Sequence, residues 1–180
     1  MKAMMIALLL SMNAHAGSLA GVTMPDTAQL GGQTLVLNGM GLREKYMLDI
    51  YVGGLYLPQK SSDAAAIINM DAPKRVTMTF IYDEVPKDKV VETLYEGIAK
   101  YPEFASLKPQ LDKFAGLMED LVKGDQMVYE YVPGQGTSVI IKGKNKGTVP
   151  GTDFMKLVFS IYIGSKPANE ALKAGMLGKG

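Results

Sequence analysis

A long β-forming run between Tyr46 and Leu57 places the tightest constraint on how this chain folds. The run is rich in aromatic, aliphatic and β-branched residues and is closed by Pro58, which is typical of a long strand. Because side chains alternate across a strand, the run has an apolar face and a mixed face. The apolar face holds Leu48, Ile50, Val52, Gly54 and Tyr56, and the mixed face holds Met47, Asp49, Tyr51, Gly53 and Leu55. We expect the first face to lie in the core and the second to line a cleft, with an ordinary central strand as the alternative.

Glycines precede this strand and lie in its middle. Gly39 and Gly41 bracket a predicted turn before the strand, and Thr34–Leu37 is a further β-forming run. The stretch from Gly31 to Leu57 is therefore predicted to form a hairpin. Two adjacent glycines in the middle of the strand, Gly53-Gly54, predict a bulge or the close approach of another group.

Arg43 follows the first pair of glycines. Glycines allow a ligand to approach the backbone, so an arginine beside them suggests a binding site. The segment Gly39-Met40-Gly41 is not a dinucleotide fingerprint, because Glu44 stands where the third glycine would be.

The N-terminus has the pattern of an export signal. Lys2 supplies the positive start, Ala3–Met12 a short apolar core, and Ala14-His15-Ala16 an Ala-x-Ala cleavage motif. The apolar run is too short to span a bilayer. We predict a signal peptide over residues 1–16, a periplasmic or secreted location, and a single domain over residues 17–180. A buried N-terminal helix is the alternative.

Cleavage at this motif changes the chemical inventory of the chain. The only histidine, His15, leaves with the signal, and the formal charge falls from +1 to zero because Lys2 leaves too; the chain has no cysteine. These losses exclude His/Cys zinc sites, thiol nucleophiles and Ser-His-Asp triads from the mature domain. No metal or cofactor is expected, and a near-zero net charge argues against a nucleic-acid partner.

The rest of the chain groups into runs of strands and runs of helices. The predicted strands are Val22–Pro25, Lys74–Tyr82, Gln126–Val132 and Thr137–Ile141. The predicted helices are Ala64–Met70 capped by Ser62 or Asp63, Lys87–Lys100 opened by Pro86, Phe104–Val122, a helix capped by Thr152, and Glu170–Leu177. Lys142–Gly147 is predicted to be a basic hairpin tip, either solvated or in contact with an anion. This order predicts the α+β class, with an antiparallel sheet and helices on one side.

Several segments, in this order, resemble the chalcone isomerase superfamily, especially its bacterial exported chalcone-isomerase-like branch. They are Asn38–Arg43, Ile50–Leu57, Val85–Glu92, Lys123–Asp125, Pro133–Thr137 and Ile161–Gly164, with Pro167 and Leu172-Lys173 beyond them. The resemblance covers Gly31 to Leu177. It implies an open-faced β-sandwich in which a large antiparallel sheet carries a layer of helices, with a ligand cleft between the two.

The resemblance also implies roles for particular positions. In the plant enzymes a phenolate adds to an enone within one chalcone molecule, and an arginine stabilises the developing charge; Arg43 matches this arginine and Lys89 matches a lysine of the same site. The neutral hydrogen-bonding positions differ: they hold Tyr51 for a threonine, Pro86 for a tyrosine, Thr93 for an asparagine, and Asn169 nearest to a serine or threonine. Losing one preorganised donor typically removes about 3–4 kcal/mol of transition-state stabilisation, so these replacements disfavour efficient cyclisation.

Three functions remain open on the sequence. The first is a non-catalytic protein that binds an amphipathic small molecule such as a fatty acid, and its predicted ligand-binding residues are Arg43, Tyr51, Lys89, Thr93 and Asn169. The second is an isomerase, an intramolecular lyase for a chalcone-like substrate, with Arg43 and Lys89 as catalytic candidates. The third is a structural or partner-binding module without a ligand, favoured if Asp49 pairs with Arg43. No oligomeric state is predicted.

Overall fold

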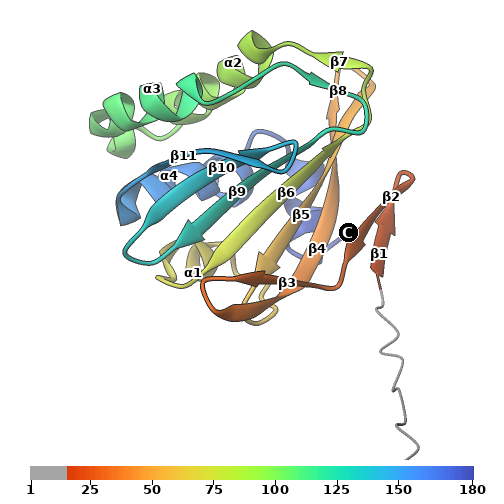
Figure 1. Cartoon of the computed structure of the whole chain (residues 1–180), viewed down its shortest axis with the longest axis horizontal. Coiled ribbons are helices and arrows are strands. Elements are labelled where there is room, and N and C mark those ends of the chain that lie inside the picture. Colours follow the sequence, from red (N-terminus) through yellow and green to blue (C-terminus); the bar gives the residue numbers. More distant parts are fainter. Residues whose placement is uncertain (1–15) are drawn as a thin grey trace, which may run out of the picture.

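The structure, a computed structural model, describes residues 16–180 and has a curled antiparallel sheet of seven strands at its centre (Figure 1). The strand order is β11-β10-β9-β6-β5-β4-β3. These strands are β3 (Thr27–Leu30), β4 (Gln33–Lys45), β5 (Leu48–Leu57), β6 (Lys74–Phe80), β9 (Gln126–Val132), β10 (Gly136–Ile141) and β11 (Lys144–Val149). Two small sheets pair β1 (Ala16–Leu19) with β2 (Val22–Pro25), and β7 (Glu84–Val85) with β8 (Leu121–Val122).

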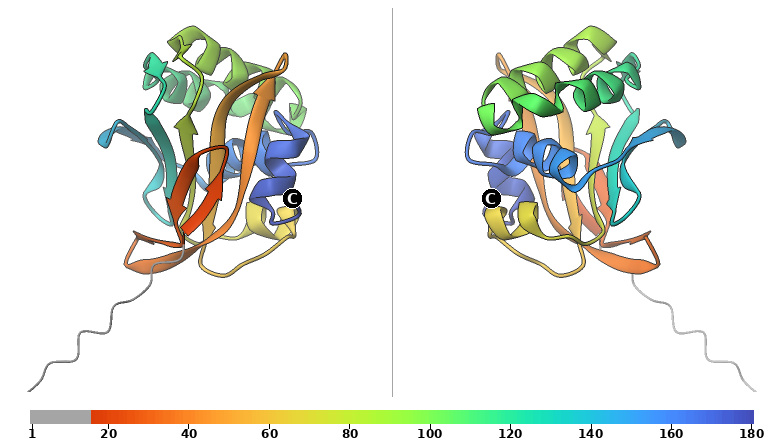
Figure 2. Two further views of the ribbon diagram at one scale, coloured as in Figure 1. Left: turned by 90° about the vertical axis from the view of Figure 1, so that its right-hand side faces the viewer. Right: turned by 90° about the vertical axis from the view of Figure 1, so that its left-hand side faces the viewer.

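Helices cover one face of the sheet, and the β1–β2 hairpin lies on the other (Figure 2). The helices are α1 (Ala64–Asn69), α2 (Lys87–Ala99), the 3-10 helix η1 (Pro102–Leu107), α3 (Lys108–Gly116), α4 (Thr152–Ile163) and α5 (Glu170–Met176). The main core lies between the sheet and α4, in which every residue from Leu157 to Ile163 is buried. This arrangement confirms the predicted α+β class and its open-faced sandwich. Apart from Ala16, the predicted signal peptide lies outside the described residues.

The β4–β5 hairpin was predicted, but its turn lies elsewhere. Gly39 and Gly41 sit inside β4, and the chain turns at Tyr46-Met47, where the strand pairing closes between Lys45 and Leu48. The prediction of a turn at the two glycines is therefore wrong. Glycine marks close packing at these positions, as shown below, and not a change of chain direction.

The two faces of β5 are both buried, with the larger core on the mixed face. Tyr51 and Leu55 face the helices, whereas Val52 and Tyr56 join a smaller cluster beneath the β1–β2 hairpin. Val52 and Tyr56 of the apolar face are buried as expected, although in the smaller of the two cores, and Tyr51 of the mixed face lines a pocket. The mixed face packs against the larger core. Its polar residue Tyr51 is accommodated there because its side chain lines a pocket.

Three predicted segments have different boundaries. The helix predicted over Phe104–Val122 is divided into η1, α3 and β8, because Pro109 fits only the first turn of a helix and α3 ends at Gly116. The basic tip predicted over Lys142–Gly147 is a two-residue turn followed by strand β11. The cap of α4 is Gly151, one residue before the predicted Thr152.

Candidate functional site

Arg43 and Tyr51 are direct neighbours across β4 and β5. The next pair along the hairpin is Glu44 with Asp49, so Ile50 is the extra residue of a β-bulge. Bulges bend a strand and re-aim its side chains, and they are common beside functional sites. Arg43 and Tyr51 are 8% and 7% exposed. The bulge thus brings a cation and a phenol together at the buried end of the hairpin.

Helix α5 packs directly on β4 beside this pair. A Cβ atom on Gly39 would clash with the carbonyl oxygen of Gly175, and one on Gly41 with the carbonyl oxygen of Leu172. The glycines before Arg43 therefore allow a helix of the same chain to approach. This corrects the interpretation that they allow a ligand to approach. The close approach predicted at Gly53-Gly54 is also made by other parts of the chain, because side chains of α5 lie over Gly53 and Met24 of β2 lies over Gly54.

The Arg43 guanidinium is held from one side only. Its Nη1 donates a hydrogen bond to the carbonyl oxygen of Ala168, in the loop that precedes α5. Within residues 16–180 no carboxylate forms an ion pair with Arg43. Asp49, the predicted internal partner, is exposed and makes no such pair. The expected alternative of an Arg43–Asp49 pair is therefore wrong.

A pocket of about 310 Å³ opens beside Arg43, between the sheet and α2. That volume lies at the lower end of the range for small-molecule sites. Its interior is largely apolar, and the residues that carry this character are Ile50, Met78, Phe80, Val85, Val90 and Met127. Charged residues from the hairpin end, β7 and α2 surround the mouth, namely Lys45, Glu84, Lys89 and Glu92. The pocket therefore combines an apolar interior with one buried cation.

Two buried phenols lie on the wall of the pocket next to Arg43. Burial raises the pKa of Tyr51 and of Tyr162 well above the ordinary value, and the nearby Arg43 cation offsets only part of this effect. Both phenols therefore stay neutral, and the Tyr162 hydroxyl donates to that of Tyr129, which further raises the pKa of Tyr162. Within the described chain, the Tyr51 hydroxyl has no hydrogen-bonding partner, which leaves it free for a ligand.

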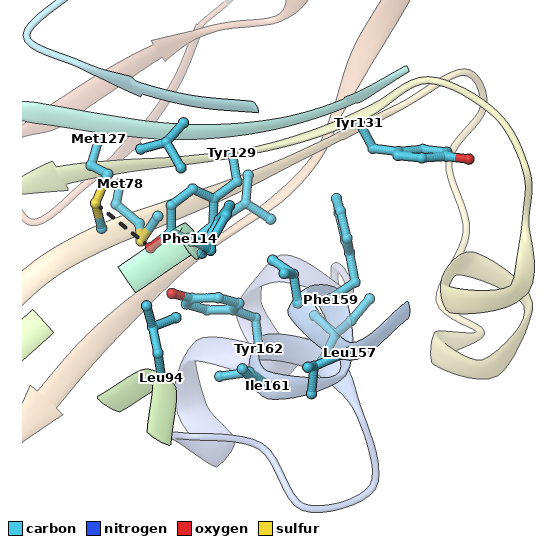
Figure 3. Close-up of a cluster of buried hydrophobic side chains, with 14 of the residues drawn as sticks. Met78, Leu94, Phe114, Met127, Tyr129, Tyr131, Leu157, Phe159, Ile161 and Tyr162 are labelled. Atoms are coloured by element: carbon cyan, nitrogen blue, oxygen red, sulfur yellow. Dashed lines mark hydrogen bonds between the residues drawn. The ribbon is translucent and has the colours of Figure 1, made fainter. Parts of the chain in front are cut away.

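Tyr162 was not predicted as a site residue. It belongs to the apolar stripe of α4, and Figure 3 shows it reaching from that helix toward Tyr129 on β9. Tyr129 directs its own hydroxyl to the sulfur atoms of Met118 and Met127, at 3.8 and 3.6 Å. The one signal in the sequence that could have identified Tyr162 is its hydroxyl, the only polar group in the predicted apolar stripe of this helix.

Lys89 and Thr93 line the pocket from α2 but lie at its rim. The ammonium group of Lys89 is 3.0 Å from a carboxylate oxygen of Glu92, and this hydrogen bond raises the pKa of the lysine. The Thr93 hydroxyl donates to the carbonyl oxygen of Lys89 at 3.2 Å. Pro86 also lines the pocket and has no N–H to offer.

Asn169 lies away from the pocket lining. Its Oδ1 accepts a hydrogen bond from the Leu172 amide at 2.8 Å and so caps α5, while its Nδ2 donates to the carbonyl oxygen of Glu44 at 3.2 Å. Both ends of the amide are therefore used to fasten α5 to the end of β4. The structure brings together four of the five predicted ligand-binding residues, and Asn169 supports them from outside.

The arrangement is suited to hold an anion at the inner end of an apolar cavity. Arg43 supplies a permanent charge, and the Tyr51 hydroxyl supplies a neutral donor beside it. Residues 16–180 contain no cluster of three or more His, Cys, Asp or Glu side chains that would hold a metal ion. None of the helices within that range is long and apolar enough to cross a bilayer.

Comparison with known proteins agrees with this fold. A family model for chalcone isomerase-like proteins matches residues 16–178, and the chain belongs to that family. The crystal structure of a fatty-acid binding protein from Arabidopsis thaliana superimposes with a TM-score of 0.73 at 17% sequence identity, covering 91% of this chain and 96% of the plant protein. At that identity the likeness shows a shared fold. No curated protein sequence matches the chain.

Proposed function

We propose that this chain is an exported, non-catalytic member of the chalcone isomerase-like family that binds an amphipathic acid such as a fatty acid. The carboxylate lies against Arg43 and the hydroxyl of Tyr51. The hydrocarbon tail occupies the apolar pocket toward Met78 and Met127.

The observation that carries this proposal is the charge of Arg43. A buried guanidinium without a counter-ion is unfavourable, because desolvation removes the hydration of its charge. Only Ala168 contacts it by a hydrogen bond within the described chain, and a guanidinium has five N–H donors. A ligand carboxylate supplies both the missing charge and further acceptors.

The pocket supports binding better than ring closure. Cyclisation of a chalcone requires donors placed where charge develops in the transition state. The Lys89 ammonium is occupied by Glu92, the Thr93 hydroxyl by its own helix backbone, and Pro86 has no donor. The fatty-acid binding protein of A. thaliana has the same fold, which supports fatty acids as the first ligands to measure.

Calorimetry with saturated fatty acids of increasing chain length tests the proposal. Arg43→Gln keeps a donor for the Ala168 carbonyl and removes the charge, so we expect affinity to fall about 10–100-fold. Arg75→Gln is the matched control, because Arg75 is the other arginine of the chain and pairs with Glu130 away from the pocket. Equal losses in both variants, or none in Arg43→Gln, would rule out a carboxylate site at Arg43.

The same protein samples decide between binding and catalysis. Chalcone absorbance is followed with wild type, with Arg43→Gln and with buffer alone. We expect the wild-type rate to equal the spontaneous rate. A faster rate that depends on Arg43 would show that the isomerase alternative is right.

Export is proposed from the first residues of the chain. Lys2, the apolar run Ala3–Met12 and the Ala14-His15-Ala16 motif support it. Membership of the bacterial exported branch rests on the same residues. N-terminal sequencing of the folded protein isolated from its host should give Gly17 as the first residue, and an intact Met1 on folded protein would contradict export.

A further inference from the structure

The end of the β4–β5 hairpin carries an apolar tip, defined here as Tyr46, Met47 and Leu48. Tyr46 and Met47 are 86% and 95% exposed. The tip accounts for three of the five large hydrophobic side chains exposed in the described part of the chain, and Tyr82 and Val122 are the others. Tyr46, Leu48 and Tyr82 also line the pocket. The exposed apolar surface of this protein is therefore gathered at the pocket mouth.

The backbone of this tip is unusual within its own chain. Over residues 16–180, four hairpins turn through two residues that both have positive φ: Ala20-Gly21, Gly31-Gly32, Tyr46-Met47 and Lys142-Gly143. That turn favours Asn, Asp and Gly, because other side chains are crowded at positive φ. Three of the four turns place glycine second, whereas Tyr46 and Met47 adopt φ of 53° and 62° without one.

Two large side chains thus occupy a turn whose backbone conformation disfavours them. Strained conformations of this kind persist where they serve a function. Tyr46 and Met47 contribute little to the core, since both are almost fully exposed. The turn therefore holds both side chains in solvent, where they can contact another surface.

We propose that the apolar tip inserts into the interfacial region of a phospholipid bilayer and brings the pocket mouth to the membrane surface. This proposal rests on the proposed function, since a bilayer is the reservoir from which a sparingly soluble amphipathic acid exchanges. Figure 2 shows the hairpin end projecting beside α2, and residues of both elements line the pocket. The ligand then passes between lipid and pocket without crossing water.

The chemistry of the tip matches a bilayer interface. Tyrosine is enriched where an apolar layer meets water, because its ring is apolar and its hydroxyl is polar. Lys45 stands at the base of the tip with its ammonium group 5.7 Å from the centroid of the Tyr46 ring, positioned to meet a lipid phosphate. A narrow projecting tip enters a fluid interface readily, whereas a stable protein interface needs a broad complementary surface.

The charges around the mouth indicate which lipid headgroup charge the tip would favour. Lys45 and Lys89 are balanced by Glu84 and Glu92, so the mouth has no excess of positive charge to attract anionic lipids. We therefore expect binding to vesicles of neutral phosphatidylcholine, with little dependence on salt concentration.

The decisive variant combines Tyr46→Asn with Met47→Gly, which installs the residues that this turn prefers. The double variant should unfold at the same or a higher denaturant concentration than wild type, while its partition onto phosphatidylcholine vesicles falls at least tenfold. Ala20→Asn is the matched control, because it creates the same Asn-Gly pair in the β1–β2 turn. The control should bind vesicles as wild type does.

Ligand exchange is measured separately with Met47→Gly, because Met47 does not line the pocket. We expect its affinity for dodecanoic acid in solution to stay within twofold of wild type, while transfer of the acid from vesicles slows at least fivefold. Wild type that binds dodecanoic acid but not vesicles, or a double variant that still binds vesicles, would overturn docking and leave the proposed function intact. A wild-type dimer in solution that the double variant loses would also overturn it, since a second copy would then cover the tip. If wild type does not bind dodecanoic acid in solution, the proposed function is rejected instead.

Discussion

Arg43 and Arg75 are the only arginines in the chain, and the fold uses them differently. Arg75 pairs with Glu130 at 2.5 Å, near the surface. Arg43 is buried, donates one hydrogen bond to a backbone carbonyl oxygen, and lines a cavity. Since burial makes an unpaired charge unfavourable, the surroundings of Arg43 are those of a side chain that can bind an anion, whereas the charge of Arg75 is already paired.

Lys74 shows how the fold can satisfy a buried cation internally. It is fully buried at the start of β6, and its ammonium donates to the carbonyl oxygens of Ile67 and Met70 at 2.6 and 2.7 Å. These carbonyls belong to the end of α1, so Lys74 completes the hydrogen bonding of that helix. Burial lowers the pKa of Lys74 to about 8, although the nearby Asp71 acts in the opposite direction.

This lowered pKa predicts a pH dependence of stability. The folded state releases the Lys74 proton near pH 8, whereas the unfolded chain keeps it to about pH 10.5. Between these values the unfolded state binds more protons, so the free energy of unfolding rises with pH, by up to about 3 kcal/mol over the full window. Urea unfolding at pH 7.0 to 9.5 should show this rise in wild type and not in Lys74→Met. A flat wild-type profile would contradict it.

The contact between α5 and β4 sets the position of the Arg43 side chain. Gly39, Gly41 and Gly175 remove the side chains that would keep the helix from the strand. Asn169 then caps α5 and binds the end of β4, and the residue before it presents its carbonyl to Arg43. The position of the guanidinium thus depends on backbone contacts between two elements far apart in the sequence.

Gly41→Ala tests this contact. The new methyl group would meet the Leu172 backbone, which cannot rotate away as a side chain can. We expect the free energy of unfolding to fall by about 1–3 kcal/mol and fatty-acid affinity to fall with it. Gly116→Ala is the control, because nothing lies within 4 Å of its new methyl group and α3 should gain about 0.4–1 kcal/mol. Equal stability of the two variants would show that α5 does not need this approach.

At the scale of the whole molecule, the class and the order of elements could be predicted from the sequence. Alternation in β6 and the Asp63 cap of α1 are local patterns that tertiary contacts reinforce. The predicted family is confirmed by the match over residues 16–178.

Other features depend on contacts that no local pattern contains. The role of Gly39 and Gly41 is set by α5, more than a hundred residues later in the chain. Tyr162 reads as core in a helical stripe and becomes a site residue only because α4 runs beside the cavity. The exposure of Tyr46 and Met47 contradicts their hydrophobicity, so a reading by hydrophobic pattern assigns them to the strand instead of the turn.

The central claim, a carboxylate held by Arg43, is tested most directly by NMR of dodecanoic acid labelled with 13C at its carboxyl carbon. The pKa of the bound carboxyl group is followed in wild type and in Arg43→Gln, over the pH range in which both proteins stay folded. A contacting guanidinium favours the ionised acid, whereas burial without it favours the neutral acid. We expect a bound pKa below that of an ordinary carboxyl group, about 4.3, in wild type and at least about one unit higher in Arg43→Gln. The same titration in both proteins would contradict the account.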